Sequence, residues 1–259
     1  MHHVRIGVLL MLPQGKAPPY AYMEETVRSW LEAAGATIVP ILPTITAAEA
    51  AAYFDHIHGL FLHEGWADTR EYLELVTLFL NMATLANRAG DYFPIWGTCQ
   101  GMQLIMQHFG GVLERVTLPV RRSFSLQPNH SPSRLLAYGQ IRNPDMLFFS
   151  HEYGITLYGF MKHPSLRSVL KVLSTSHDRE GMEYVSMIEG RDLPFYGTQF
   201  HPDRKESRLK WMAVFFVAEA RKSNHSGFDP GRHVELTRAV CHEKIGSTLC
   251  LRTVLKHHL

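Results

Sequence analysis

The chain has 259 residues, which is enough to bury a full core in one domain. Hydrophobic residues make up 46% of it, charged residues make up 19%, and the formal net charge of +2 argues against a nucleic-acid-binding or polybasic membrane protein. Three cysteines are too few for a disulfide framework, and the 16 histidines show no zinc-binding spacing.

Expected strands and helices alternate through the first half of the chain. The apolar run from Val4 to Leu10 is typical of a strand buried on both faces of a parallel sheet. It is too short for a membrane span and Pro13 closes it, so no secretion signal is indicated and the sequence as written predicts a cytoplasmic protein without a membrane segment. Further elements follow in order, with strands over 37–42, 57–62 and 94–97 and helices over 23–31, 47–53 and 73–83. This alternation predicts an α/β fold, a three-layer, doubly wound and mostly parallel sheet with helices on both faces.

Prolines separate the expected elements of the second half. Strands are expected over 146–150, 169–174, 183–188 and 194–200, and the alternating pattern of 183–188 predicts a half-buried antiparallel strand. Apolar residues at helical spacing predict an amphipathic helix over 209–220. Residues 228–259 are polar and lose the pattern, so we expect one domain over 1–227 and a poorly ordered extension over 228–259.

One short motif, Gly97-Thr-Cys-Gln-Gly101, lies between the strand expected at 94–97 and an amphipathic helix. It matches the G-x-nucleophile-x-G elbow, with Cys99 as the nucleophile. The glycines let the strand and the helix pack closely, and the N-terminal amides of the helix are expected to lower the pKa of the thiol. A buried structural cysteine fits the motif equally well, so other residues must decide.

A histidine at the end of another strand supports the catalytic interpretation. His201 follows the strand expected at 194–200, and the carboxyl ends of parallel strands gather at one edge of a sheet, where Cys99 would also lie. Asp203 comes two residues later and can orient the imidazole. His201 alone would be read as a core or surface histidine, but the three residues together predict a nucleophile, a base and an orienter.

Five segments of the chain resemble γ-glutamyl hydrolases, the folate polyglutamate hydrolases of the class I glutamine-amidotransferase-like superfamily. The most specific are Asp91-Tyr-Phe-Pro-Ile-Trp-Gly-Thr-Cys-Gln-Gly101 and Pro194-Phe-Tyr-Gly-Thr-Gln-Phe-His-Pro202. The others are 31–41, 57–62 and 215–226, so the likeness covers about residues 4–226.

The resemblance implies a cysteine peptidase that hydrolyses γ-glutamyl bonds. Cys99 would attack the carbonyl and form a thioester, His201 would act as the base, and no metal or organic cofactor would be needed. The oxyanion would be held by backbone N–H groups of Gln100 and of the loop near Gly65. The implied partners are folyl or antifolate poly-γ-glutamates as small-molecule substrates and a second copy of the chain in a homodimer. Family members usually act in lysosomes, in vacuoles or outside the cell.

The family pattern also places His151 and Tyr22 in the substrate cleft, and it marks three departures. The chain has His63-Glu64-Gly65 where the family usually has Pro-Gly-Gly, so Glu64 adds a side chain and a negative charge beside the expected oxyanion position. Asp203 and Gln103 both stand where the hydrolases usually have Glu.

Two alternatives therefore stay open. The first is a catalytically weak or inactive relative that binds γ-glutamyl compounds, and the loop at Glu64 favours it. The second is a glutaminase domain that supplies ammonia to a synthetase, and it is favoured by the segment Gln100-Gly-Met-Gln-Leu-Ile105.

Overall fold

The computed structural model describes residues 3–11, 21–65, 69–117, 124–127, 132–142, 147–204, 207, 209–227, 240–245 and 248–253. The helices are α1 (Glu25–Glu32), α2 (Ala47–His56), α3 (Arg70–Arg88), α4 (Gln100–His108), α5 (Arg134–Tyr138), α6 (Leu157–Lys162), α7 (Pro164–Val169) and α8 (Lys210–Ala220). The strands are β1 (Val4–Leu9), β2 (Ala36–Ile41), β3 (Gly59–Leu62), β4 (Ile95–Thr98), β5 (Glu114–Arg115), β6 (Ser125–Leu126), β7 (Tyr153–Gly154), β8 (Leu170–His177), β9 (Glu183–Gly190), β10 (Phe195–Thr198), β11 (Val240–Ile245) and β12 (Thr248–Thr253). Within these described segments, each helix falls short of the length or the apolar character that crossing a bilayer requires.

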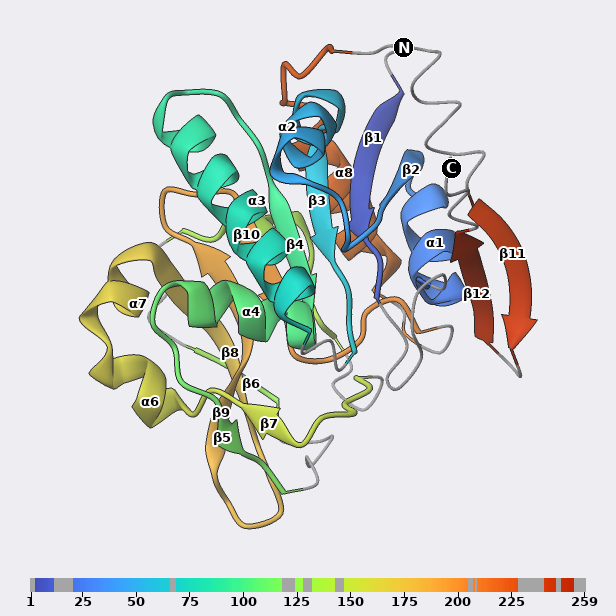
Figure 1. Cartoon of the computed structure of the whole chain (residues 1–259). Coiled ribbons are helices and arrows are strands. Elements are labelled where there is room, and N and C mark those ends of the chain that lie inside the picture. Colours follow the sequence, from blue (N-terminus) through green and yellow to red (C-terminus); the bar gives the residue numbers. More distant parts are fainter. Residues whose placement is uncertain are drawn as a thin grey trace.

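The main sheet has eight strands in the order β2-β1-β3-β4-β10-β9-β8-β6 (Figure 1). The first five are parallel to one another, whereas β9, β8 and β6 extend the sheet by antiparallel pairing. The chain moves outward from β1 to β2 and then crosses to β3 on the other side of β1. The expected doubly wound, mostly parallel sheet is therefore confirmed.

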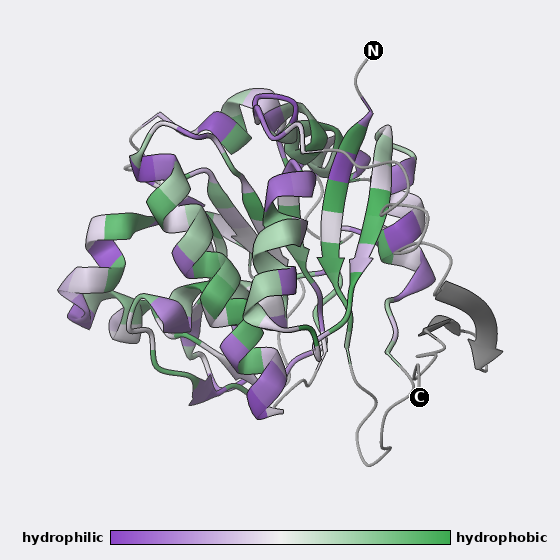
Figure 2. Ribbon diagram, turned by 45° about the horizontal axis from the view of Figure 1, so that its top comes forward, coloured by the Kyte–Doolittle hydropathy of each residue, from purple (hydrophilic) through white to green (hydrophobic). Residues whose placement is uncertain are grey.

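Each face of the sheet has its own hydrophobic core. The helices α2, α3 and α4 cover one face, with buried side chains such as Phe79 and Ile105, and α1, α5 and α8 cover the other, with Trp30 and Phe216. In Figure 2 these helices show hydrophilic segments between hydrophobic ones, as expected for helices with one face on the sheet and one in solvent. Because both faces are covered, the central strands are buried on both sides, and this explains their unbroken apolar sequences.

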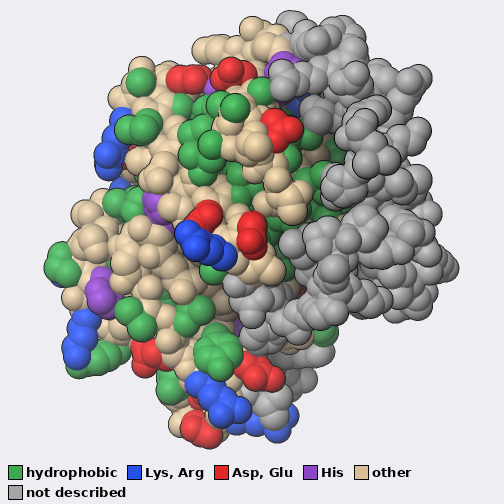
Figure 3. Space-filling view, in the orientation of Figure 1, with side chains coloured by type: hydrophobic (Ala, Val, Ile, Leu, Met, Phe, Trp, Pro, Cys, Tyr) green, Lys and Arg blue, Asp and Glu red, His purple; other side chains and the backbone are tan. Residues whose placement is uncertain are grey.

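The face of the molecule seen in Figure 3 mixes acidic and basic side chains. Among the residues that the figure colours, Lys and Arg lie close to Asp and Glu and do not gather into one large area of a single sign. This distribution agrees with the small net charge of +2.

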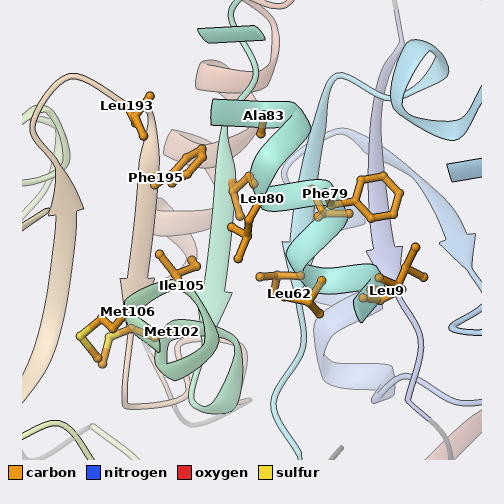
Figure 4. Close-up of a cluster of buried hydrophobic side chains, with 14 of the residues drawn as sticks. Leu9, Leu62, Phe79, Leu80, Ala83, Met102, Ile105, Met106, Leu193 and Phe195 are labelled. Carbon is orange, nitrogen blue, oxygen red and sulfur yellow. The ribbon is translucent and has the colours of Figure 1, made fainter. Parts of the chain in front are cut away.

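The start of α4 is held in place by the core shown in Figure 4. Met102 and Ile105 of α4 are fully buried against a cluster that includes Leu62 of β3 and Phe195 of β10. Full burial of one such side chain contributes roughly 1.5–3 kcal/mol to stability. The turn between β4 and α4, which contains Cys99, is therefore attached to a rigid part of the fold.

Three of the expected elements differ in the structure. Residues 147–150 of the expected strand 146–150 form no strand, and the Phe148 carbonyl accepts a hydrogen bond from the His201 backbone N–H at 2.9 Å instead. The strand β9 is buried along almost all of its length because both cores reach it. The helix α8 is buried around most of its surface because α5 packs beside it, with the rings of Tyr138 and Phe215 5.4 Å apart.

The extension expected over 228–259 lies mostly outside the described residues. Two segments are described, β11 and β12, which pair antiparallel in a sheet of their own beside α1 (Figure 1). Gly246-Ser247, between the two strands, is a two-residue hairpin signal in the sequence. The domain boundary at 227 and the poor order of the extension stay predictions.

Candidate active site

Cys99 forms the turn between β4 and α4, and its backbone is strained. Its φ is 53° and its ψ is −108°, and it is the one non-glycine residue with positive φ in the part of the chain that the structure describes. A Cβ on Gly97 would lie 2.4 Å from the backbone of Gly101, and a Cβ on Gly101 would lie 2.2 Å from the carbonyl oxygen of Leu62. The turn therefore requires both glycines and has the geometry of a nucleophile elbow.

The Cys99 side chain is buried, with only 5% of the residue exposed. The thiol donates a hydrogen bond to the Ser150 carbonyl at 3.8 Å and accepts one from Nε2 of Gln199 at 3.5 Å. Burial raises the pKa of Cys99 to about 12, although hydrogen bonds from the Gln100 backbone and from Gln199 oppose the shift. The expected lowering of this pKa by the helix amides is thus corrected, because desolvation of the thiolate outweighs those hydrogen bonds. Cys99 rests as a thiol and needs a base to react.

The hydrogen bond from Gln199 to the sulfur belongs to a buried hydrogen-bond network of two glutamines, which the sequence analysis did not predict. Gln103 Nε2 donates to Gln199 Oε1 at 3.1 Å and to the Tyr153 carbonyl at 2.6 Å. Gln103 therefore holds the Gln199 amide with its nitrogen toward Cys99. One signal for Gln199 was available, since it lies two residues before His201 in an extended segment and alternate residues share a side.

His201 follows β10 and is only 3% exposed. Its Nδ1 is in ion-pair contact with Oε2 of Glu64, and neither ring nitrogen has a hydrogen-bond partner among the described residues. Burial lowers the pKa of His201 to about 3, and Arg204 and His63 add to the shift. The imidazole is therefore neutral at neutral pH. If the proton of the neutral ring lies on Nδ1, beside the Glu64 carboxylate, Nε2 is free to accept another proton.

The structure corrects the expected position of Asp203. Its Oδ2 accepts a hydrogen bond from Oγ1 of Thr26 in α1 at 2.6 Å. Within the described residues no hydrogen bond joins Asp203 to His201, and Asp203 is not part of the cavity wall described next. The short aspartate side chain is held toward α1, and the carboxylate at Nδ1 of His201 comes from Glu64.

A cavity of about 490 Å³ brings the other expected site residues together. Its lining includes all of them except Asp203: Cys99, His201, Gly65, Gln100, His151 and Tyr22. The lining also contains residues that the sequence analysis did not select for the site: Glu24, Glu64, Gln103, Leu113, Ser150, Tyr153 and Arg204. The nucleophile and the base thus open into one space, which has room for part of a small-molecule substrate.

His151 enters the cavity wall as a neutral side chain. Its Nδ1 bonds the Tyr153 carbonyl at 2.8 Å, and burial lowers its pKa to about 4. Its Nε2 is buried without a hydrogen-bond partner among the described residues. This nitrogen is an acceptor that a substrate N–H or O–H group could satisfy.

Gly65 has a backbone that suits glycine alone. Its φ is 148°, and a Cβ there would lie 2.3 Å from Cε of Met11. Tyr22 is held nearby, because its backbone forms an antiparallel bridge with Met11 through hydrogen bonds of 2.9 and 2.8 Å. Both residues therefore have fixed backbone positions at the cavity.

The charged groups of the cavity come from three segments. Arg204 places Nη2 3.5 Å from Oε1 of Glu64 and lies 5.0 Å from the centre of the Phe148 ring. Burial raises the pKa of Glu24, partly offset by Arg204. Across the described ranges no group of three or more His, Cys, Asp or Glu side chains is arranged to hold a metal ion.

Comparison with known proteins places the chain in a family. The model of the glutamine amidotransferase class I family matches residues 20–218. The chain therefore belongs to the class I glutamine amidotransferase family. A crystal structure of a GMP synthase component from Thermoplasma acidophilum has the same fold, with a TM-score of 0.60, 19% identity, and coverage of 86% of this chain and 96% of that one.

Among curated proteins the chain is similar to γ-glutamyl hydrolases, which confirms the resemblance. It is 28% identical over 235 residues to γ-glutamyl hydrolase B of Dictyostelium discoideum, covering 79% of this chain and 67% of the relative. It is also 28% identical over 233 residues to γ-glutamyl hydrolase of Homo sapiens, covering 79% of this chain and 72% of the relative.

Proposed function

We propose that this chain is a cysteine peptidase that hydrolyses the γ-glutamyl bonds of folate polyglutamates. One observation supports the proposal most: the strained Cys99 and the unpartnered Nε2 of His201 open into the same cavity. Relatives named γ-glutamyl hydrolase support the γ-glutamyl bond as the one cleaved, and the folate polyglutamate is implied by the resemblance in sequence.

The proposed reaction begins from a thiol and a neutral imidazole. Nε2 of His201 takes the proton from Cys99 as the sulfur attacks the γ-carbonyl carbon, and it then gives that proton to the leaving amine. Water hydrolyses the resulting thioester with the same histidine as base. The backbone N–H of Gln100, which already faces the sulfur, and that of Gly65 would hold the oxyanion. Losing one such donor typically costs roughly 100- to 1,000-fold in rate.

Two residues of the cavity would recognise the glutamyl group. Arg204 would attract an α-carboxylate of the poly-γ-glutamate chain, because its side chain is one-third exposed at the cavity. The unpartnered Nε2 of His151 would accept a hydrogen bond from the substrate. Asp203, in this proposal, supports the start of α1 through Thr26 and does not touch the reacting atoms.

The test is digestion of a pteroylpolyglutamate between about pH 5 and pH 8, the range in which histidine bases usually work. The wild-type protein should shorten the glutamate chain, and Cys99→Ala should leave it intact. If the wild-type protein also leaves it intact while binding it, the non-catalytic alternative holds. If the protein instead releases ammonia from free glutamine, the glutaminase alternative holds.

The proposal extends to a homodimer, which light scattering on the full chain would show as twice the monomer mass.

For the compartment we keep the prediction from the sequence, which is the cytoplasm. Fractionation of cells that express the natural gene product tests this. Recovery of the protein in lysosomes, in vacuoles or in the medium would contradict it.

A further inference from the structure

Two carboxylates, those of Asp203 and Glu64, lie near the base His201, and only that of Glu64 contacts it. Asp203, on the same segment, is engaged by Thr26 at 2.6 Å. Glu64, from the loop after β3, makes the contact with Nδ1. Glu64 is 7% exposed, so a negative charge on it would be buried and would have to be matched by positive or hydrogen-donating groups.

The preceding residue fixes the Glu64 backbone. Nε2 of His63 accepts a hydrogen bond from the Glu24 backbone N–H at 2.9 Å. The proton of the neutral ring must then lie on Nδ1, which is 2.5 Å from the Glu64 carbonyl oxygen and donates to it. Burial lowers the pKa of His63 to about 4, so this tautomer persists at neutral pH. His63 therefore ties the loop to the segment before α1 and leaves the Glu64 side chain to face the cavity.

The two oxygens of Glu64 have separate partners. Oε2 meets Nδ1 of His201, and Oε1 faces Nη2 of Arg204 at 3.5 Å. The carboxylate thus lies between the base and the cation at the cavity, as an orienting acid of a catalytic triad does with a histidine. The two differences from the family pattern are complementary. The loop after β3 has Glu64 where the family usually has glycine, and the acid after His201 is the shorter Asp203 where the family usually has glutamate.

We propose that Glu64 is the positioning residue of the site, the carboxylate that holds His201 by its Nδ1–H in place of Asp203. The assignment deepens the proposed hydrolase function and rests on it. When Nε2 takes the Cys99 proton, the imidazolium that forms keeps its Nδ1 proton on Glu64, and the positive charge is met by the carboxylate. Nε2 then returns the proton to the leaving amine, and Glu64 stays ionised throughout.

The charged and titratable groups around His201 make the role of Glu64 specific. Arg204 and His63 both act against protonation of the imidazole, and Cys99 is the proton donor. Glu64 is the carboxylate in contact with the ring, and in this proposal its charge opposes that of Arg204. Without it, Arg204 would face His201 uncompensated and the base would be weaker.

The test uses Cys99 alkylation by iodoacetamide as its readout, because this reaction needs no γ-glutamyl substrate. Mass spectrometry of the Cys99 peptide gives the rate as a function of pH. Glu64→Gln should slow alkylation near neutral pH by at least about tenfold, part of the roughly 10²- to 10⁴-fold that a positioned base contributes. Glu64→Asp, which keeps the charge, should recover part of the rate, and the exposed Glu32→Gln at the far end of α1 should match wild type.

A second measurement reads the protonation of His201 in the wild-type protein itself. Nitrogen-15 NMR of the wild-type protein, with the His201 signals assigned by their loss in His201→Asn, should show the proton on Nδ1. A proton on Nε2 overturns the proposal. So does a Glu64→Gln alkylation profile equal to wild type, or a larger effect of Asp203→Asn than of Glu64→Gln.

The outcomes separate this proposal from the hydrolase assignment. If Glu64 controls alkylation but no polyglutamate is cleaved, the positioning role stands and the substrate is wrong. If polyglutamate is cleaved and Glu64→Gln leaves both kcat and alkylation unchanged, the hydrolase stands and the positioning role fails.

Discussion

Gln199 directs its amide nitrogen at the sulfur of Cys99, 3.5 Å away, and Gln103 holds that amide in this orientation. Both glutamines are buried. Gln103 uses its own nitrogen for two acceptors, so a glutamate at this position could not make the same pair of bonds. A glutamine at position 103, where the hydrolases usually have glutamate, is therefore consistent with a hydrogen-bond network that stabilises the Cys99 thiolate when it forms.

Replacing Gln199 with leucine should slow the reaction of Cys99. The amide is one of two hydrogen bonds that lower the thiol pKa, so its loss raises that pKa further. A hydrogen bond to a charged group contributes about 1.5–3 kcal/mol, so alkylation near neutral pH should slow by about tenfold or more. Gln107→Leu, on the exposed end of α4, is the control and should react like wild type. Equal rates for both variants would show that Gln199 does not act on the sulfur.

The pH dependence of kcat/KM should lack the acidic limb of an ordinary histidine. The base form of His201 is needed, and its pKa is about 3, while the pKa of Cys99 is about 12. Neither group titrates in between, so kcat/KM should be level from about pH 5 to about pH 8 once substrate ionisation is corrected for. An acidic limb near pH 6.5, the unperturbed histidine value, would contradict the neutral, buried imidazole.

The sequence predicted the fold well because burial on both faces of a parallel sheet produces long apolar runs. Val4 to Leu10 and 57–62 are such runs, and β1 and β3 lie there. Residues 147–150 were misassigned because their apolar side chains are buried against the site by long-range contacts. The Phe148 carbonyl bonds His201 and the Ser150 carbonyl meets Cys99, so the segment has partners other than a neighbouring strand.

The site was predictable where local motifs define it and not where side chains meet across the sheet. Cys99 is marked by its glycines and His201 by its place after a strand. The choice of Glu64 over Asp203 depends on where the β3 loop turns, and that depends on the hydrogen bonds of His63. The direction in which the pKa of Cys99 shifts depends on the burial of its side chain, and the spacing of residues in the sequence does not indicate burial.

Stability should fall as the pH is lowered from about 6.5 toward 4. His63 and His151 have pKa values of about 4 in the folded protein and about 6.5 when unfolded, so the unfolded state binds more protons within that window. Each histidine accounts for a loss of up to ~3 kcal/mol once the pH is below its folded pKa. Urea unfolding at stepped pH measures this, and His151→Gln should reduce the slope. A slope unchanged by that substitution would mean that His151 is protonated in the folded protein.

Gly101→Ala should destabilise the fold and abolish reaction at Cys99. The added Cβ would lie 2.2 Å from a backbone oxygen of β3, which cannot move aside as a flexible side chain could. Overpacking of a core typically costs about 1–3 kcal/mol. Because the contact is with backbone, we expect the free energy of unfolding, measured with urea, to fall by about 3 kcal/mol or more. Gly90→Ala is the comparison, because it has positive φ but nothing within 4 Å, and it should cost only about 1–2 kcal/mol. Equal losses would mean that strand and helix can separate at the elbow.

Arg204→Met should separate substrate binding from proton transfer. If Arg204 receives an α-carboxylate, its loss removes a charge-assisted hydrogen bond, and KM for a pteroylpolyglutamate should rise roughly tenfold or more while kcat changes less. The same charge also lowers the pKa of His201, so the acidic limb of kcat/KM should move upward in the variant. Arg191→Met, exposed at the opposite end of the sheet, is the control and should leave both quantities unchanged. A fall in kcat with KM unchanged would show that Arg204 acts only through Glu64, 3.5 Å away, and leaves the substrate to other cations.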